Sequence, residues 1–293
     1  MTTRLHRVFI QAIPLLFVFL WSTGFIGAKY ALPFIEPFYL LFIRMLWTIA
    51  VFLLLCVVLR VQWPSWQQAG HQMVTGLLLH GLYLGGVFAA IKWGMPAGIT
   101  AIVVGIQPLL TAVLGWRLFG ERLLPRQWLG LALGLIGVTV VILSTRGYGN
   151  FDFAWSAIAA SLIALAAIVM GTVYQKRFGG GVNLVAGSLW QYVSTALFMG
   201  LLAYSFETRV VVWDKQLIFA LAWLVLGLSV SAILLLMYMI REGEAAKVAS
   251  YFYLVPPATS IEAWLLFDES LPLLAMAAIA LTVAGVYLVV KKT

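Results

Sequence analysis

The stretch QPLLTAVLGWRLFGE (residues 107–121) recurs as VPPATSIEAWLLFDE (residues 255–269), 148 positions further along the chain. Around this pair, residues 94–142 align with residues 242–290 without a gap, and 14 of the 49 positions are identical. The matches include Pro, Thr, Trp, Glu and Gly in the same order, which a shared abundance of Leu and Val does not explain. The chain is therefore predicted to consist of two homologous halves.

The composition indicates a membrane protein. Of the 293 residues, 63% are hydrophobic and 10% are charged, whereas a soluble domain carries about 25% charged residues. The mean hydropathy is +1.04. The net charge of +8 arises from basic residues in short loops between apolar runs, so it does not indicate a nucleic-acid partner. The single cysteine, Cys56, excludes an intrachain disulfide and a cysteine-based metal site.

Ten apolar runs are long enough to cross a bilayer, which takes about 20 residues. The connections between them are short, so any function must reside within the helix bundle. The basic N-terminus and the apolar run after it also resemble a signal peptide, but the run is long enough to span, and we interpret it as an uncleaved first helix. The predicted spans are 9–28, 37–59, 70–91, 97–119, 125–145, 153–175, 184–206, 215–240, 244–267 and 272–290.

The distribution of basic residues predicts the orientation. With ten spans both termini lie on one side of the membrane, and that side carries twelve Lys and Arg residues against five on the other. The more basic side is the cytoplasmic one, so both termini are predicted to be cytoplasmic. Five spans per half is an odd number, so the second half, 151–293, is inverted relative to the first, 1–150. The predicted fold is an all-α membrane protein of two inverted five-helix repeats, a recurrent architecture of secondary transporters.

Two sequence patterns carry a family resemblance. The first span contains WSTGF (residues 21–25), with Lys29 one turn further and Arg44 in the second span. Each half ends with a helix that carries a central proline, then an acidic turn, then a helix containing glycine. The turns read GER (residues 120–122) and DES (residues 268–270), so an aspartate replaces the glycine in the second half. This arrangement resembles the drug/metabolite transporter superfamily, in its ten-helix branch of paired EamA-type repeats, over nearly the whole chain.

The resemblance carries expectations about function. Within the superfamily, the length and the aromatic content (12 Trp, 11 Tyr, 18 Phe) are similar to those of the YddG-type exporters of aromatic amino acids. That similarity implies a multi-pass protein of the bacterial inner membrane that exports aromatic amino acids and related metabolites. It also implies a central cavity between the two halves. Exporters of other amino acids, metabolites or drugs in the same superfamily are the alternative.

Four residues within the spans are predicted to form a gate or hinges. Pro108 and Pro256 each remove one helical hydrogen bond near mid-membrane and favour a kink, which serves either as a hinge or as a static feature of packing. Arg44 and Glu262 lie at similar depth in the outer halves of their spans and could pair. The pair would act as an extracellular gate, as a static ion pair, or as two side chains that extend separately to the interface.

Three further charged residues lie near span ends. Lys29 is predicted to be a solvated lysine at the interface. Glu121 and Glu269 lie at turns near helix ends, where free backbone donors suit a carboxylate, and are predicted to be structural caps.

The predicted substrate site centres on the third span. His80 lies near the middle of the membrane, with Tyr83 one turn away on the same face. A histidine at this depth lines a cavity, relays a proton or bonds to another helix. Mostly apolar walls with a few placed polar groups suit an amphipathic solute, and aromatic walls suit a ring. The remaining predicted substrate-binding residues are Trp21, Gln107, Met170, Tyr174, Ser231, Tyr238, Ser250 and Tyr253.

Some functions are excluded by missing motifs. The sequence has no nucleotide-binding loop and no zinc-protease motif, so neither an ATP-driven pump nor a cofactor or metal is predicted. Phosphate-bearing substrates are disfavoured because Arg44 is the only Lys or Arg that lies far from the ends of a predicted span. The expected partners are a small-molecule substrate and the lipid bilayer, with the oligomeric state left open. A membrane enzyme acting on lipid-linked groups and a passive channel are the alternatives from other classes.

Overall fold

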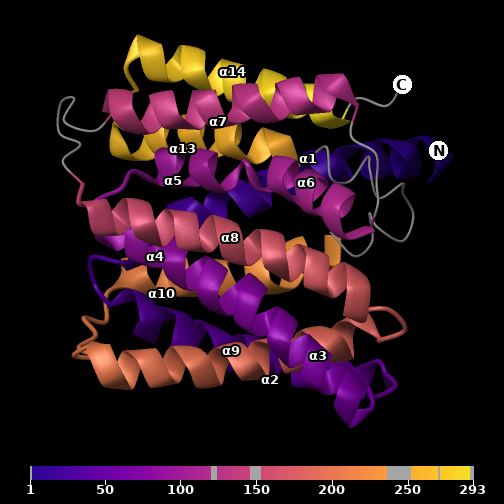
Figure 1. The fold of residues 1–293 in the computed structure, drawn as a ribbon. Coiled ribbons are helices and arrows are strands. Elements are labelled where there is room, and N and C mark those ends of the chain that lie inside the picture. Colours follow the sequence, from indigo (N-terminus) through magenta and orange to yellow (C-terminus); the bar gives the residue numbers. More distant parts are fainter. Residues whose placement is uncertain (1, 120–123, 146–152, 236–251, 270, 291–293) are drawn as a thin grey trace.

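The computed structural model describes residues 2–119, 124–145, 153–235, 252–269 and 271–290. The described residues form helices that run roughly parallel to one another, and no strand is found among them (Figure 1). The start of α1 and the end of α14 lie at the same end of the bundle. An all-α fold was predicted and is confirmed.

The helices follow one another with short connections. Most are α-helical, η1 and η2 are π-helical, and η3 is a 3-10 turn. In chain order they are α1 (Thr2–Ala31), α2 (Pro37–Val58), α3 (Trp66–Gly76), η1 (Leu77–Leu82), α4 (Tyr83–Lys92), α5 (Ala97–Val104), α6 (Gln107–Phe119), α7 (Pro125–Thr145), α8 (Trp155–Phe178), α9 (Leu184–Phe206), α10 (Lys215–Ala222), η2 (Trp223–Ala232), η3 (Phe252–Leu254), α13 (Val255–Phe267) and α14 (Leu273–Val290).

Several of these elements combine into one membrane span. The third span is α3, η1 and α4, the fourth is α5 and α6, the eighth is α10 and η2, and the ninth contains η3 and α13. Seven stretches are long and apolar enough to cross a membrane, and α7 and α14 contain shorter apolar segments. With α13 these make up the ten helices that were predicted. The predicted residues 236–240 and 244–251 lie outside the described part of the chain.

The helices pair according to the sequence repeat. Contacts join α7 to α14 and α2 to α9, which are corresponding helices of the two halves, and α5 to α13, which belong to the corresponding fourth and ninth spans. The contact of α8 with η1 has its counterpart in the contact of α1 with η2, and the contact of α1 with α13 has its counterpart in that of α6 with α8. Figure 1 shows α7 and α14 together at one edge of the bundle and α2 and α9 at the other. Exchanging the halves therefore leaves the pattern of contacts unchanged, as a pseudo-two-fold axis requires.

Local irregularities in the helices also repeat. A shift of 148 positions places the π-helix η1 on residues 225–230, which lie within the π-helix η2. The bounds of α6, 107–119, map onto those of α13, 255–267. The predicted spans included neither match. A hydrophobic run does not reveal where a helix changes from α-helical to π-helical hydrogen bonding or where it is interrupted.

The two prolines stand at helix starts. The fourth span breaks at Gly105 and Ile106, and Pro108 is the second residue of the helix that follows. Pro256 is likewise the second residue of α13. A proline in the first helical turn leaves no hydrogen bond unmade, so the predicted kink is instead a break between two helical segments. A Cβ on Gly105 would overlap the Pro256 ring, so the two spans touch where they break.

Close helix approach depends on Gly76, the last residue of α3. A Cβ at this position would overlap the backbone of Gln191 in α9. The backbone of α9 cannot turn aside as a side chain could, so the two helices would have to separate. Small residues at helix contacts are a general requirement of membrane bundles, where apolar burial alone does not hold helices together.

We expect Gly76→Ala to lower the thermal unfolding temperature of the detergent-purified protein by several degrees, because overpacking costs about 1–3 kcal/mol. Gly70→Ala in the same helix is the matched control, since nothing lies within 4 Å of a Cβ built there. Fluorescence-detected unfolding of the two variants checks the prediction. Equal unfolding temperatures would contradict the close contact between α3 and α9.

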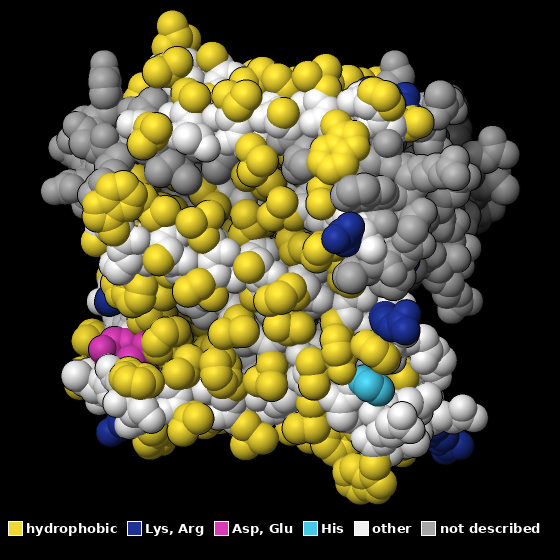
Figure 2. Space-filling model, viewed as in Figure 1, with side chains coloured by type: hydrophobic (Ala, Val, Ile, Leu, Met, Phe, Trp, Pro, Cys, Tyr) yellow, Lys and Arg dark blue, Asp and Glu magenta, His cyan; other side chains and the backbone are white. Residues whose placement is uncertain are grey.

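The outer surface suits a lipid environment. On the face shown in Figure 2 the middle of the bundle is apolar, and the charged side chains lie toward its two ends. Exposed tryptophans stand near helix ends, where the interfacial region of a bilayer is expected. They are Trp63, Trp66, Trp93, Trp128, Trp155 and Trp213.

Candidate functional site

A buried arginine occupies the interior of the bundle. Arg44 on α2 is 4% exposed, and its Nε donates a hydrogen bond to the Ser229 hydroxyl of η2 at 3.1 Å. Among the residues that the structure describes, no carboxylate forms an ion pair with it. Tyr83 and Tyr192 are its electrostatic neighbours. The guanidinium is therefore a buried cation surrounded by neutral polar groups.

Arg44 and Tyr192 are counterparts in the sequence repeat, 148 positions apart. They lie together because α2 and α9 are corresponding helices that pair with each other. The cluster around Arg44 is thus at the pseudo-two-fold axis, where the two halves meet.

His80 on η1 extends this cluster. Its Nε2 donates to the side-chain oxygen of Gln191 at 3.1 Å, and its ring stacks on Tyr192 with 4.7 Å between the ring centres. The Gln191 amide in turn donates to Gln72 of α3 at 2.6 Å. His80 and Tyr83, which the sequence placed on one face, both belong to the cluster. The interhelical hydrogen bond, one of the roles considered for His80, is present.

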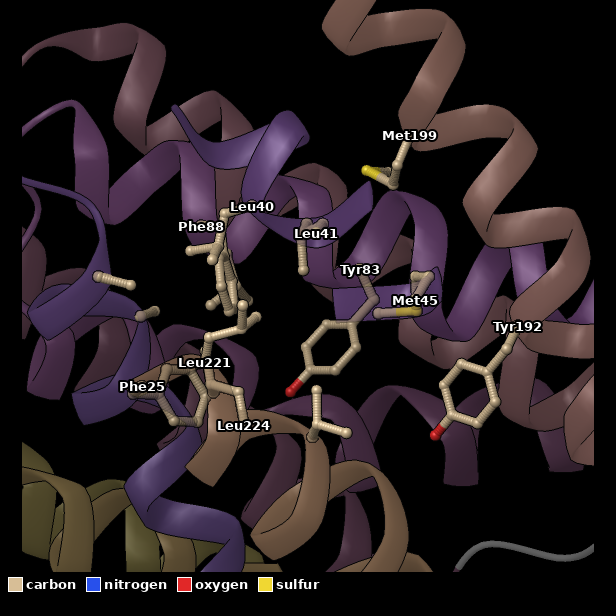
Figure 3. Close-up of a cluster of buried hydrophobic side chains, with 14 of the residues drawn as sticks. Phe25, Leu40, Leu41, Met45, Tyr83, Phe88, Tyr192, Met199, Leu221 and Leu224 are labelled. Atoms are coloured by element: carbon tan, nitrogen blue, oxygen red, sulfur yellow. The ribbon is translucent and has the colours of Figure 1, made fainter. Parts of the chain in front are cut away.

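The tyrosines give the cluster apolar walls with polar tips. Tyr83 is 6% exposed and Tyr192 is 2% exposed. The hydroxyl of Tyr192 donates to the Ser229 carbonyl at 3.3 Å. Figure 3 shows the hydroxyl ends of both tyrosines turned the same way, among apolar neighbours that include Met45 and Leu224. The site therefore combines one cation with rings and aliphatic side chains.

The predicted pairing of Arg44 with Glu262 is wrong in this structure. Glu262 on α13 instead accepts a hydrogen bond from the Ser22 hydroxyl of α1 at 2.6 Å. Similar depth in the membrane did not bring the two side chains together, because α2 and α13 belong to different parts of the bundle and Arg44 faces η2. Any gate made by these two residues would need another conformation.

Trp21 lies in an aromatic group near the Glu262 contact. Its ring centre is 5.3 Å from that of Phe17 and 5.2 Å from that of Phe252, in tilted and edge-on arrangements. Trp223 of η2 donates its indole N–H to Thr23, next to Ser22, at 2.9 Å. Trp21 is thus a partly buried residue that packs against other rings on the α1 side of the bundle.

Gln107 and Tyr174 connect other helices. The Gln107 amide donates to the Thr172 hydroxyl of α8 at 3.3 Å. The Tyr174 hydroxyl is 2.8 Å from Nδ1 of His71, close to the end of α8. No hydrogen bond or ring contact of the described residues joins either side chain to His80.

Two predicted site residues point out of the bundle. Met170 is 49% exposed and continues the outward stripe that includes Ile163 of α8. Ser231 is exposed and donates to the Leu226 carbonyl of its own π-helix at 2.7 Å. Neither side chain faces the bundle interior in this structure, because the position of a residue along a span does not fix which face of the helix it lies on. Tyr238 and Ser250 lie outside the described residues, as does the side chain of Tyr253.

The bundle end at which α1 and α13 finish, called here the Lys29 end, is tied together by charge. Lys29 forms an ion pair with Glu269, which is 5% exposed. Glu269 also accepts from the backbone N–H groups of Ala97 and Gly98 at 3.4 and 3.5 Å, at the start of α5. The expectation of a solvated Lys29 is therefore wrong, and the expectation that Glu269 caps a helix is confirmed. Glu121 lies outside the described residues.

Two further carboxylates brace the same end. Glu207 accepts from the N–H groups of Phe38 and Tyr39 at 2.8 and 2.7 Å, at the start of α2. Burial raises the pKa of Glu207 despite these bonds. Glu36 accepts from the backbone and hydroxyl of Thr208. Burial acts to raise the pKa of Glu36, but the hydrogen bonds outweigh it and the pKa is lowered. These hydrogen bonds thus hold the segment before α2 and the segment after α9 together.

The cluster contains polar residues that sequence reasoning missed. Gln72, Gln191, Tyr192 and Ser229 are each buried within an apolar span. Polar residues in such a span are themselves a signal, and the repeat offers another. At the offset of 148, Ser229 corresponds to Gly81, which is adjacent to His80, and Tyr192 corresponds to Arg44. Mapping Arg44 through the repeat would have found Tyr192, and mapping His80 would have led to Leu228, the neighbour of Ser229.

Comparison with known proteins gives the family. The model of the EamA-like transporter family matches residues 10–143 and again residues 155–291. The uncharacterized transporter YvbV of Bacillus subtilis is 29% identical over 94% of this chain and 90% of its own length. A Salmonella typhimurium protein named "Probable amino-acid metabolite efflux pump" is 28% identical over 94% of this chain and 92% of its own length.

The inner membrane transporter YedA of Escherichia coli is 30% identical over 73% of this chain and 68% of its own length. A solved crystal structure with a TM-score of 0.67 and 24% identity, covering 94% of both chains, shares the fold. The family match covers both halves of the chain, which agrees with the repeat and the helix pairing. The chain therefore belongs to the EamA-like transporter family, and it is a multi-pass membrane transporter of small molecules.

Proposed function

We propose that this transporter exports small amphipathic metabolites, and aromatic amino acids in particular, by alternating access between its two halves. The observation that carries the proposal is the buried cation of Arg44, which has no carboxylate partner among the described residues. An unpaired buried charge is costly, and a substrate carboxylate would complete a charge-assisted pair there. Binding of the substrate carboxylate would therefore relieve the energetic cost of the unpaired Arg44 charge in each transport cycle.

The surroundings of Arg44 favour a substrate with a ring. Tyr83, Tyr192 and His80 offer flat faces against which an indole or phenyl group can pack. Met45 and Leu224 belong to the same buried cluster and add apolar surface. A carboxylate at Arg44 and a ring among these side chains describe an aromatic amino acid. The name of the Salmonella relative supports amino-acid metabolites as the class and efflux as the direction.

Alternating access is supported by the pairing of the halves. We propose that 1–150 and 151–293 are the two moving units, in the bacterial inner membrane with both termini in the cytoplasm. The Lys29 end, held by its ion pair and by Glu36 and Glu207, would then be the extracellular end in its closed state. The breaks before Pro108 and Pro256 touch each other and would serve as hinges.

Flux measurements in proteoliposomes test the substrate class. We expect labelled tryptophan and phenylalanine to exchange across the membrane, and threonine and glutamate to exchange more slowly, because neither has a ring. The double variant His80→Ala, Tyr83→Ala is expected to lose most of the aromatic flux by removing the walls of the site. Fluxes that do not distinguish the aromatic substrates from the others, or that the double variant leaves unchanged, would contradict the proposed site.

A further inference from the structure

The carboxylate of Glu262 lies inside the bundle with only one of its two oxygens hydrogen-bonded. Its Oε1 accepts the hydrogen bond from Ser22, and its Oε2 is buried without a hydrogen-bond partner. No Lys or Arg among the described residues forms an ion pair with it. Thr259, one turn earlier on α13, donates to the Ser22 carbonyl at 3.3 Å and so ties the same two helices together.

The neutral acid is the favoured form of Glu262 in this conformation. An ionised carboxylate with one oxygen buried and unpaired loses its hydration without compensation, and the cost far exceeds that of an unpaired neutral O–H group. A proton on Oε2 removes the charge, while Oε1 keeps the bond from Ser22. When the contact between α1 and α13 opens and water reaches Oε2, the proton can leave.

The acid has no equivalent in the other half. Position 262 corresponds to Leu114, which packs with the apolar core on α6. Packing between α1 and α13 therefore does not require a carboxylate, since the corresponding contact between α6 and α8 is made without one at that position. The charge is a specific addition to one of two equivalent contacts.

We propose that Glu262 is a proton-binding site through which the protein exchanges protons for exported substrate; this inference rests on the function proposed above. Hydrogen bonds join the proton site to the substrate site through η2. Arg44 bonds to Ser229 of η2, and Trp223 of η2 bonds to Thr23 beside Ser22. A movement of η2 when the substrate binds at Arg44 would therefore be transmitted to the α1 contact of Glu262.

Other titratable groups near Glu262 are few. From α1 they are Lys29 and Tyr30, of which Lys29 is bound to Glu269, and α5 contributes none. On α13 and the turn after it they are Asp268 and Glu269, and η3 contains Tyr253. Glu269 is already paired and caps α5, and Asp268 is exposed in the turn after α13, so Glu262 is the acid within these helices that is free to exchange a proton with substrate binding.

A pH gradient across proteoliposomes tests the coupling. We expect the wild type to accumulate tryptophan against its gradient when protons flow the opposite way. Glu262→Gln is expected to lose this accumulation entirely and to keep exchange of labelled for unlabelled tryptophan at equal pH. Glu262→Asp should retain part of the response. Asp214→Asn, which removes an exposed carboxylate outside the spans and can still cap the start of α10, is the matched control and should respond to the gradient as the wild type does.

The outcomes separate this inference from the proposed substrate. If the wild type exchanges tryptophan but ignores the pH gradient, or if Glu262→Gln responds to it like the wild type, the coupling is overturned and the substrate proposal stands. If no amino acid is exchanged, infrared titration of the purified protein decides. A carbonyl band of a neutral carboxylic acid at pH 7 that disappears in Glu262→Gln supports the proton site, and the absence of such a band overturns it.

Discussion

Arg44→Gln is expected to lower the ratio of maximal rate to half-saturation concentration for tryptophan and phenylalanine transport by about 10- to 100-fold. Hydrogen bonds to charged groups contribute about 1.5–3 kcal/mol, and each 1.4 kcal/mol corresponds to a tenfold change in affinity. The loss should appear mainly as a higher half-saturation concentration, because glutamine still donates hydrogen bonds but no longer neutralises the carboxylate. Initial rates of flux in proteoliposomes over a range of substrate concentrations check the prediction.

Two controls distinguish a binding role for Arg44 from a structural one. Removing a buried charge that has no carboxylate partner among the described residues should leave the unfolding temperature unchanged or raise it, so activity would fall while stability does not. Tryptamine, which has the ring but lacks the carboxylate, should be transported no better by the wild type than by Arg44→Gln. A variant that binds tryptophan as well as the wild type would show that the carboxylate is held elsewhere.

Lys29→Gln is expected to open the Lys29 end. Glu269 is 5% exposed, and the substitution leaves its charge without a cation. Breaking a buried ion pair by removing one partner costs about 3–5 kcal/mol, and because the Lys29 side chain is 32% exposed, we expect an effect near or below the lower end of that range. The population of the open state should rise at least about 10-fold.

Labelling of an introduced cysteine measures this opening. Ala28, fully buried on α1 beside Lys29, is changed to cysteine in a Cys56→Ser background, so that the reporter is the only thiol. Lys29→Gln should speed its reaction with a membrane-impermeant maleimide. Lys92→Gln is the matched control, since Lys92 bonds to the Leu32 carbonyl at the same end and forms no ion pair among the described residues.

The double variant Lys29→Gln, Glu269→Gln tests whether the ion pair closes the Lys29 end through its charge. Removing both charges also removes the isolated carboxylate, so labelling should be slower than in Lys29→Gln alone. If the double variant labels at least as fast as the single one, the ion pair acts through packing and not through its charge.

The sequence predicted the spans and their pairing well because both follow from general requirements. A bilayer demands long apolar runs, and a gapless repeat demands that corresponding helices play corresponding roles. The predicted bounds of the second and seventh spans differ from those of α2 and α9 by at most one residue. The repeat of Pro108 as Pro256 marked where both spans break, although the proline was expected inside a helix and not at its start.

Side-chain partners were harder to predict, because they depend on how each helix is rotated. Arg44 and Glu262 lie at similar depths, yet one faces Ser229 and the other Ser22. A π-helical turn adds to the difficulty, since it shifts the face of every later residue relative to an α-helix. Ser231 lies near the end of such a segment, η2, and points outward. Depth is set by hydrophobicity, whereas rotation is set by packing that a single sequence does not specify.

The closeness of Arg44 and Tyr192, which both bond to Ser229, bears on how the protein could have evolved. If the halves arose from duplication of one gene, the ancestor was a pair of identical five-helix chains in opposite orientations. Position 44 of one copy then faced position 44 of the other across the symmetry axis, as in any two-fold interface. Two arginines there would have repelled each other in a medium of low dielectric constant. A single cation at the axis therefore became possible only after fusion released the two copies to diverge, and the symmetric ancestor could not have possessed this site.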